Sequence, residues 1–210
     1  MVVLYRVHGV ICMGVSIQYA SSTSRTKGKR VIMAKKSVPK IRSSKLSQSQ
    51  LKQMAMGLRA IKAKVIAPAT VKTAEWVRWK CQFGCGGFES SLVCPPHTPA
   101  PAQTRLMLNG YKQAILFEAP RGQSKKIAAA LEKKLFLAGY YKALGLGSGP
   151  CELCETCAFD EGCLHPYEAR PSMEACGIDV FATVRSHGFT IDVVRTRKTP
   201  QHYFGLVLVE

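Results

Sequence analysis

The sequence predicts an α+β fold: a single cysteine-rich domain with a small mixed sheet covered by helices, in a ferredoxin-like order of strands and helices, behind a basic N-terminal extension. Two observations support this class. Residues 114–146 contain an apolar run, an amphipathic segment and a second apolar run, as expected for a strand–helix–strand unit. Residues 191–194 and 204–209 are two further apolar runs, which predict a terminal hairpin.

The N-terminal part of the chain is expected to differ from the rest of the 210 residues. We expect residues 1–45 to form a disordered basic extension, because residues 21–45 are rich in serine, lysine and arginine and offer little apolar surface to bury. Residues 46–210 are expected to form the cysteine-rich domain. Met33, followed by an alanine and two lysines, is our preferred candidate for the true start of translation.

The first predicted element of the domain is an amphipathic helix. It would begin at Ser47, because apolar residues then recur at three- and four-residue steps between residues 51 and 65. Residues 65–67 predict a short strand. Thr98 is expected to cap the next helix, which would end at Gly110.

Strands and helices are expected to alternate in the second half of the domain. Residues 114–117 predict a buried strand, and Ser124 is expected to cap a helix that ends at Gly139. Residues 140–146 predict a second strand. A further helix is expected over residues 172–187, before the terminal hairpin.

Basic residues are concentrated at one end of the chain. The formal net charge is +17, but residues 1–80 carry 17 Lys and Arg residues against a single acidic residue, Glu75. Residues 81–210 carry 13 basic and 12 acidic residues, so the cysteine-bearing part is nearly neutral. A basic arm of this kind suits a polyanion, and nucleic acid is the partner that it would bind.

The nine cysteines favour metal ligation in a reducing cytoplasm. Their odd number and their clustering at ligand spacings argue against a secreted disulfide framework. The apolar run between Val10 and Ile17 is interrupted by Gly14 and Ser16, and it is short for a secretory signal. No stretch approaches the ~20 apolar residues that a spanning helix needs, so no membrane association is expected.

The strongest chemical motif is a run of cysteines. Cys151, Cys154 and Cys157 follow one another at three-residue steps, and Cys163 comes after a longer gap. Two residues between cysteines let a tight turn aim successive sulfurs at one centre, as in the ligation of a [4Fe–4S] cluster. Zinc is the alternative, although its sites more often combine cysteine pairs from two separate loops. Whether Cys163 or Cys176 would supply the fourth ligand stays open.

A second set of cysteines precedes this run. Cys81, Cys85 and Cys94 are expected to bind metal together with Cys176, and three glycines around Cys85 would let the backbone approach the metal. Eight cysteines remain when Cys12 is set aside, so one or two [4Fe–4S] clusters are expected, with zinc as the alternative. A site with three cysteines alone would leave one iron open to a substrate.

Residues 170–179 combine an arginine with a predicted helix start at Ser172. A helix N-terminus beside an arginine would suit an anion or a carboxylate ligand. The simpler interpretation, which we favour, is a capped helix in which Arg170 pairs with Glu168 or Glu174.

Four segments together resemble a known family. They are residues 79–85, 94–96, 151–163 and 170–179. In this combination they are similar to the predicted metal-binding proteins of domain of unknown function 2284, over about residues 60–210. The resemblance implies a cysteine-ligated metal or iron–sulfur site in a prokaryotic, cytosolic protein, and it implies no established reaction.

Two functions from different classes are consistent with these features. The first is an iron–sulfur protein that transfers electrons or assists a redox enzyme, with a redox protein as its partner. The second is a structural zinc protein that binds nucleic acid through its basic arm. The sequence identifies no catalytic residue and no substrate, so whether the protein is an enzyme stays open.

Overall fold

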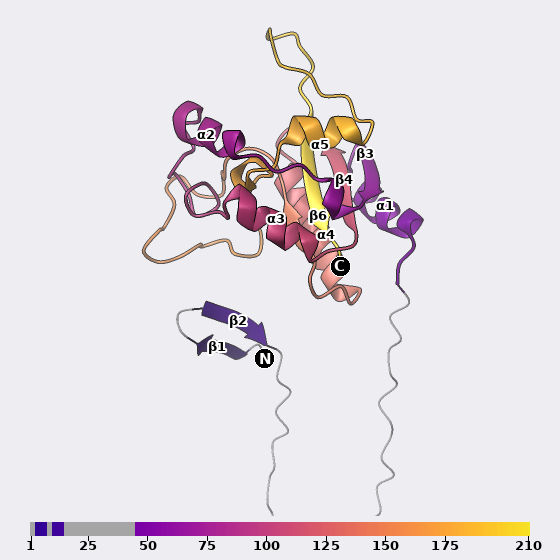
Figure 1. Ribbon diagram of the computed structural model, residues 1–210. Helices are drawn as coiled ribbons and strands as arrows, with labels where there is room; N and C mark the ends of the chain where they lie inside the picture. Colours follow the sequence, from indigo (N-terminus) through magenta and orange to yellow (C-terminus); the bar gives the residue numbers. More distant parts are fainter. Residues whose placement is uncertain (1–2, 8–9, 15–44) are drawn as a thin grey trace, which may run out of the picture. The chain divides into compact units, whose positions relative to one another are not determined.

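The computed structural model describes residues 3–7, 10–14 and 45–210 of the chain (Figure 1). The chain divides into two compact units, residues 1–41 and 42–210. Within the described residues, no helix has the length and the apolar character that a membrane crossing requires.

The first unit contains a hairpin. Strands β1 (Val3–Val7) and β2 (Val10–Gly14) pair in antiparallel fashion. Apart from Lys45, the segment predicted to be disordered, residues 21–45, lies outside the described residues. The predicted boundary between extension and domain therefore stays a prediction.

The second unit is built on a four-stranded sheet with the order β3-β4-β6-β5. Every pair of neighbouring strands in it is antiparallel. The strands are β3 (Lys62–Ile66), β4 (Ala114–Ala119), β6 (Tyr203–Leu208) and β5 (Leu144–Leu146). The α+β class is confirmed, and the sheet is antiparallel rather than mixed.

The position of β6 explains this difference. The predicted strand–helix–strand unit exists as β4, helix α4 (Ser124–Leu137) and β5. However, β6 lies between β4 and β5 and is antiparallel to both, so the two parallel strands of the unit are not neighbours. The ferredoxin-like order is not confirmed, because the last strand of the chain occupies the centre of the sheet beside β4.

One face of the sheet is covered by α1 (Gln48–Met56) and α4. Successive strand residues point to opposite faces, and Ile115, Phe117 and Val207 point to this one. They form a core with apolar side chains of the two helices: Leu51, Ala55, Ile127, Leu131 and Leu135.

The other face is covered by α3 (Pro101–Asn109), α5 (Val180–Ser186) and two single-turn 3₁₀ helices, η1 (Pro68–Thr70) and η2 (Glu174–Cys176). Leu116 and Leu206 point to this face, so β4 and β6 are apolar on both sides. The side chains that cover them include Val71, Leu108, Met173, Cys176, Ile178 and Val184.

The predicted first helix is confirmed but is shorter than expected. Ser47 caps α1 through a capping box with Gln50, and the helix ends at Met56. Arg59 then takes a left-handed backbone conformation with φ of 69°, which turns the chain into β3. The apolar residues beyond Gly57 therefore belong to a turn and a strand rather than to one continuous helix.

Two predicted helix caps are wrong. The α3 N-cap is Ala100, and the Thr98 hydroxyl instead donates to the Ala175 carbonyl oxygen at 2.6 Å. Ser124 is the first residue of α4 and makes no cap bond; its hydroxyl lies 2.7 Å from that of Ser148. In both cases a hydroxyl that could have served locally bonds to a distant segment.

The helix predicted over residues 172–187 is interrupted. Gly177 ends η2 with φ of 73°, and Asp179 then caps α5 by accepting a hydrogen bond from the Ala182 amide. A Cβ atom at Gly177 would lie 2.3 Å from Pro101 Cγ, so α3 approaches this turn too closely for any other residue. The break lets η2 and α5 cover different parts of the sheet.

The terminal hairpin is wrong, and the second strand is shorter than predicted. Residues 191–194 form no strand, and the Ile191 carbonyl oxygen accepts hydrogen bonds from the Arg185 guanidinium. Strand β6 has no free edge for them, because β4 and β5 flank it. Only residues 144–146 of the segment 140–146 are in a strand, although Tyr140 is buried.

Gly205 should be required in the centre of the sheet. A Cβ atom there would lie 2.3 Å from Phe117 Cζ and 3.0 Å from the Leu146 carbonyl oxygen. We expect Gly205→Ala to lower the free energy of unfolding by roughly 1–3 kcal/mol, measured by urea denaturation. Gly84→Ala is the control, because nothing lies within 4 Å of its Cβ position. Equal stability of the two variants would contradict the packing described here.

Candidate functional site

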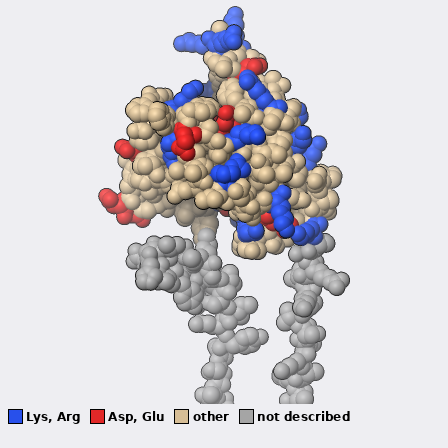
Figure 2. All heavy atoms as spheres, viewed as in Figure 1, with Lys and Arg blue, Asp and Glu red and all other residues tan. Residues whose placement is uncertain are grey.

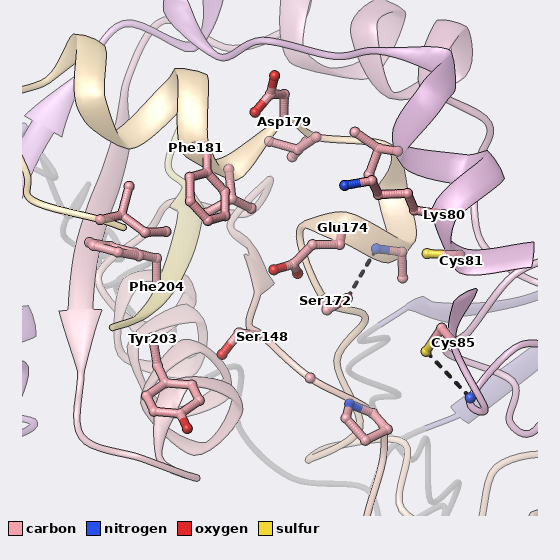
Figure 3. Close-up of a pocket in the computed structure, with 18 of the residues that line it drawn as sticks. Lys80, Cys81, Cys85, Ser148, Ser172, Glu174, Asp179, Phe181, Tyr203 and Phe204 are labelled. Carbon is pink, nitrogen blue, oxygen red and sulfur yellow. Dashed lines mark hydrogen bonds between the residues drawn. The ribbon is translucent and has the colours of Figure 1, made fainter. Parts of the chain in front are cut away.

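Three of the predicted metal ligands line one cavity. Helix α2 (Glu75–Gly84) carries Cys81 in its last turn, Cys85 follows its end, and Cys94 is buried nearby. All three border a cavity of about 590 Å³, whose other walls come from residues 148–150, η2, α5 and β6 (Figure 3).

Glycines give the segment around Cys85 room to move. Nothing lies within 4 Å of the Cβ positions of Gly84 and Gly86, and Cys85 is exposed. The Gly87 amide donates a hydrogen bond to Cys85 Sγ at 3.4 Å (Figure 3). An amide that points at sulfur stabilises the thiolate form, which is the form that binds metal.

The second cysteine run lies in a closed loop, residues 147–171, without helix or strand beyond its first residues. The Gly147 amide donates to the Pro171 carbonyl oxygen, and the Met173 amide donates to that of Gly147, both at 2.9 Å. The two ends of the loop are thus fixed side by side. Its cysteines differ in exposure: Cys151, Cys154 and Cys157 are half-buried, whereas Cys163 is exposed.

One hydrogen bond connects the two cysteine segments. The Leu92 amide, from the segment between Cys85 and Cys94, donates to Cys157 Sγ at 3.4 Å. The loop therefore lies against the segment that carries the first cysteine set.

Arg170 has a different partner from those predicted. Its guanidinium makes two parallel hydrogen bonds with the Glu132 carboxylate of α4, Nε to Oε2 and Nη2 to Oε1, each at 2.7 Å. Oε2 also accepts the Gly145 amide at 2.7 Å. The predicted pairing with Glu168 or Glu174 is wrong, because the closing of the loop brings Arg170 to the side of α4.

The structure brings the predicted cluster ligands close together. Partial desolvation raises the pKa of Cys154, and the neighbouring Cys151, Cys157 and Cys163 raise it further. Burial likewise raises the pKa of Cys81, followed by Cys85. Within the described part of the chain, however, no three Cys, His, Asp or Glu side chains meet in an arrangement that could hold a metal ion.

Cys176 lies apart from the other cysteines. It belongs to the hydrophobic core under the sheet, is 1 % exposed, and does not line the cavity. Burial raises the pKa of its thiol to about 12. Its proposed role as a ligand stays a prediction, and in this structure the thiol is protonated at neutral pH.

The sequence did not single out two buried charged groups at this site. Glu174 Oε2 and Lys125 Nζ are buried and have no hydrogen-bond partner among the described residues. Burial raises the pKa of Glu174 and lowers that of Lys125, whereas Cys151 and Cys94 raise the pKa of Lys125. Lys125 therefore lies near one cysteine of each set. No sequence pattern marks it, because it begins a helix beside another lysine.

The comparison with protein families decides what kind of protein this is. Residues 64–209 match the family model described as predicted metal-binding protein (DUF2284). The chain belongs to this family. The match contains both cysteine sets and leaves out the hairpin with Cys12. No curated protein and no solved structure matches the chain.

The membership confirms the resemblance drawn from the four sequence segments. It also supports a metal-binding, cysteine-rich protein as the coarse description of this chain. Neither the metal nor a reaction follows from the family's description. The interpretation of the site therefore depends on its chemistry.

The cysteines should differ in reactivity in reduced, metal-free protein. We expect Cys85 and Cys163, which are exposed, to react with iodoacetamide at pH 7 at least about a hundredfold faster than Cys176. The pKa of about 12 leaves Cys176 protonated, and its burial covers it. Timed mass spectrometry of the labelled peptides measures the rates, and urea-unfolded protein is the control. Labelling of Cys176 as fast as Cys163 in folded protein would contradict the structure.

The Arg170–Glu132 pair should stabilise the closed loop. Its side chains are only 14 % and 18 % exposed, so Glu132→Gln would leave a poorly solvated guanidinium without its counter-charge. We expect a loss of about 3 kcal/mol in the free energy of unfolding. Lys45→Gln, which breaks the more exposed pair with Glu210, should cost less than about 1 kcal/mol. Similar losses in both variants would show that the buried pair has no special role.

Proposed function

We propose that this protein carries a [4Fe–4S] cluster on Cys151, Cys154, Cys157 and Cys163 and transfers electrons to or from a redox enzyme. The observation that carries the proposal is the Leu92 amide, which donates to Cys157 Sγ. Backbone amides that point at cysteine sulfur are typical of cluster sites, because they stabilise the thiolate and set the reduction potential.

The chemistry of the loop fits such a group. Its cysteines carry only thiol donors at short spacing, and they lie outside the sheet, where the backbone can adapt to a metal. The sulfurs are near one another without meeting at one point, so loading with iron would draw them together. A bound cluster would supply one-electron chemistry, and the chain's own residues would hold it and set its surroundings.

Lys125 supports an anionic group at this place. Its ammonium is buried, has no hydrogen-bond partner among the described residues, and lies near Cys151 and Cys94. A cation without a counter-charge is unfavourable in a poorly solvated site. Cysteine thiolates and a cluster with net negative charge would supply that counter-charge from both cysteine sets.

A protein partner is part of this proposal. Phe159, Leu164 and Tyr167, at 40 %, 59 % and 70 % exposure, place apolar side chains on the same loop as the cluster ligands. Electron-transfer partners meet over small surfaces close to the redox centre. Acidic and basic side chains are interspersed on the visible face of the second unit (Figure 2), so apolar contacts and not a single-sign field would select the partner. We place the reaction in a reducing cytoplasm, where free cysteines persist.

Anaerobic purification tests the cluster. We expect brown protein that absorbs near 400 nm, with about four irons and four sulfides per chain, or about eight of each if the first cysteine set binds a second cluster. Cys163→Ser should lower the iron content and change the electron paramagnetic resonance spectrum of the reduced protein. Cys12→Ser, outside the matched residues, is the control.

Two outcomes would contradict the proposal. Colourless protein with stoichiometric zinc would identify a structural zinc site in the same thiols. Unchanged iron and spectrum in Cys163→Ser, with loss in Cys176→Ser, would remove Cys163 from the ligand set and require Cys176 to leave the core.

A further inference from the structure

We propose that the cavity beside Cys81, Cys85 and Cys94 is a binding site for a small organic ammonium ion with an apolar or aromatic body, held by the Glu174 carboxylate. The proposal concerns an organic ligand and is independent of the cluster on the 147–171 loop. A cavity of about 590 Å³ has the size that small-molecule sites commonly have.

Glu174 supplies the recognition group. It lies on η2 and lines the cavity, and its Oε2 is buried without a hydrogen-bond partner among the described residues. In Figure 3 the carboxyl group points away from Cys81 and Cys85, toward the side of the cavity with Phe181 and Phe204. A buried carboxyl oxygen without a partner is unfavourable, and a ligand that donates to it would remove this penalty.

The walls around Glu174 favour a cation over a neutral ligand. They are rich in aromatic rings, whose faces attract an organic ammonium group. The combination of aromatic rings with a carboxylate is the chemistry that binds such groups in proteins. The aromatic residues of the lining are Trp76, Phe88, Phe181, Tyr203 and Phe204.

The other charged side chains of the lining are already engaged. Asp179 caps α5, Asp192 lies 3.6 Å from the Arg185 guanidinium, and His202 bonds to Glu118 at 2.7 Å. The Lys80 ammonium lies over the Trp76 ring, 5.2 Å from its centre. Glu174 is therefore the charged group of this lining that is left for a ligand.

The position of η2 is firmly fixed, so the site is preformed. The Ala74 amide donates to the Gly177 carbonyl oxygen at 2.9 Å, and Thr98 donates to that of Ala175 at 2.6 Å. Arg78 of α2 in turn donates to the Thr98 hydroxyl and carbonyl oxygen. A ligand held by Glu174 would extend across the cavity toward the side that carries the cysteines.

Three probes of similar shape and different charge test this site. Benzylamine, benzyl alcohol and phenylacetate are titrated into the full-length, metal-free chain, and binding is followed by nuclear magnetic resonance of the tryptophan indole N–H groups. We expect benzylamine to bind at least about tenfold more tightly than benzyl alcohol, and phenylacetate not to bind. The Trp76 signal should shift and the Trp79 signal should not, because Trp76 lines the cavity and Trp79 does not.

Glu174→Gln should abolish the preference for the amine. The glutamine has the shape of the protonated glutamic acid, so the fold is expected to be kept, and circular dichroism checks this. Asp192→Asn is the matched control, since Asp192 lines the same cavity and its side chain is 74 % exposed; the preference should persist. If Glu174→Gln does not fold, Glu174→Asp replaces it, and the shorter carboxylate should weaken benzylamine binding without changing that of benzyl alcohol.

Three results would overturn the proposal: equal binding of amine and alcohol, an amine preference that survives in Glu174→Gln, or no binding of any probe. Because the titrations use metal-free protein, these results leave the iron content of the anaerobic protein unaffected. Conversely, an absence of iron would reject the cluster without touching the amine site.

Discussion

The closure of the cysteine loop at Gly147 is the contact on which the site depends. The Gly147 amide and carbonyl group bond to residues 171 and 173, which join the start of the loop to its end. The same residue lies against α4, because a Cβ atom there would be 2.5 Å from Lys125 Cγ. One glycine thus sets the distance between the loop, η2 and α4. A larger residue would push Lys125 away from the cysteines and η2 away from the cavity.

The elements that depend on local pattern could be predicted from the sequence. Strand β4, helix α4 and the capping of α1 by Ser47 follow from periodicity and from short-range hydrogen bonds, and the structure contains all three. Residues 191–194 show why an apolar run is insufficient evidence for a strand. Whether such a run pairs depends on a free strand edge, and the edges of β6 are already occupied.

The candidate site was predictable in its residue types and not in its arrangement. Spacing identified the cysteine sets, and the family match covers both of them. The partner of Arg170, the Leu92–Cys157 contact and the buried Lys125 are set by tertiary packing between distant segments, about which the sequence holds no local pattern. Burial was equally out of reach: Cys94, beside the cavity, and Cys176, in the core, are both covered, and only the fold distinguishes them.

The Leu92 amide has a consequence for how the two cysteine sets respond to each other. It belongs to the chain segment of one set and stabilises negative charge on a sulfur of the other. Whatever deprotonates or oxidises Cys157 changes the strength of this bond and hence the free energy of the segment between Cys85 and Cys94. Coupling of this kind is reciprocal, so occupancy of the first set would alter the affinity and the potential of the second by the same free energy. Two sites linked through one amide would fill and change redox state as a cooperative pair.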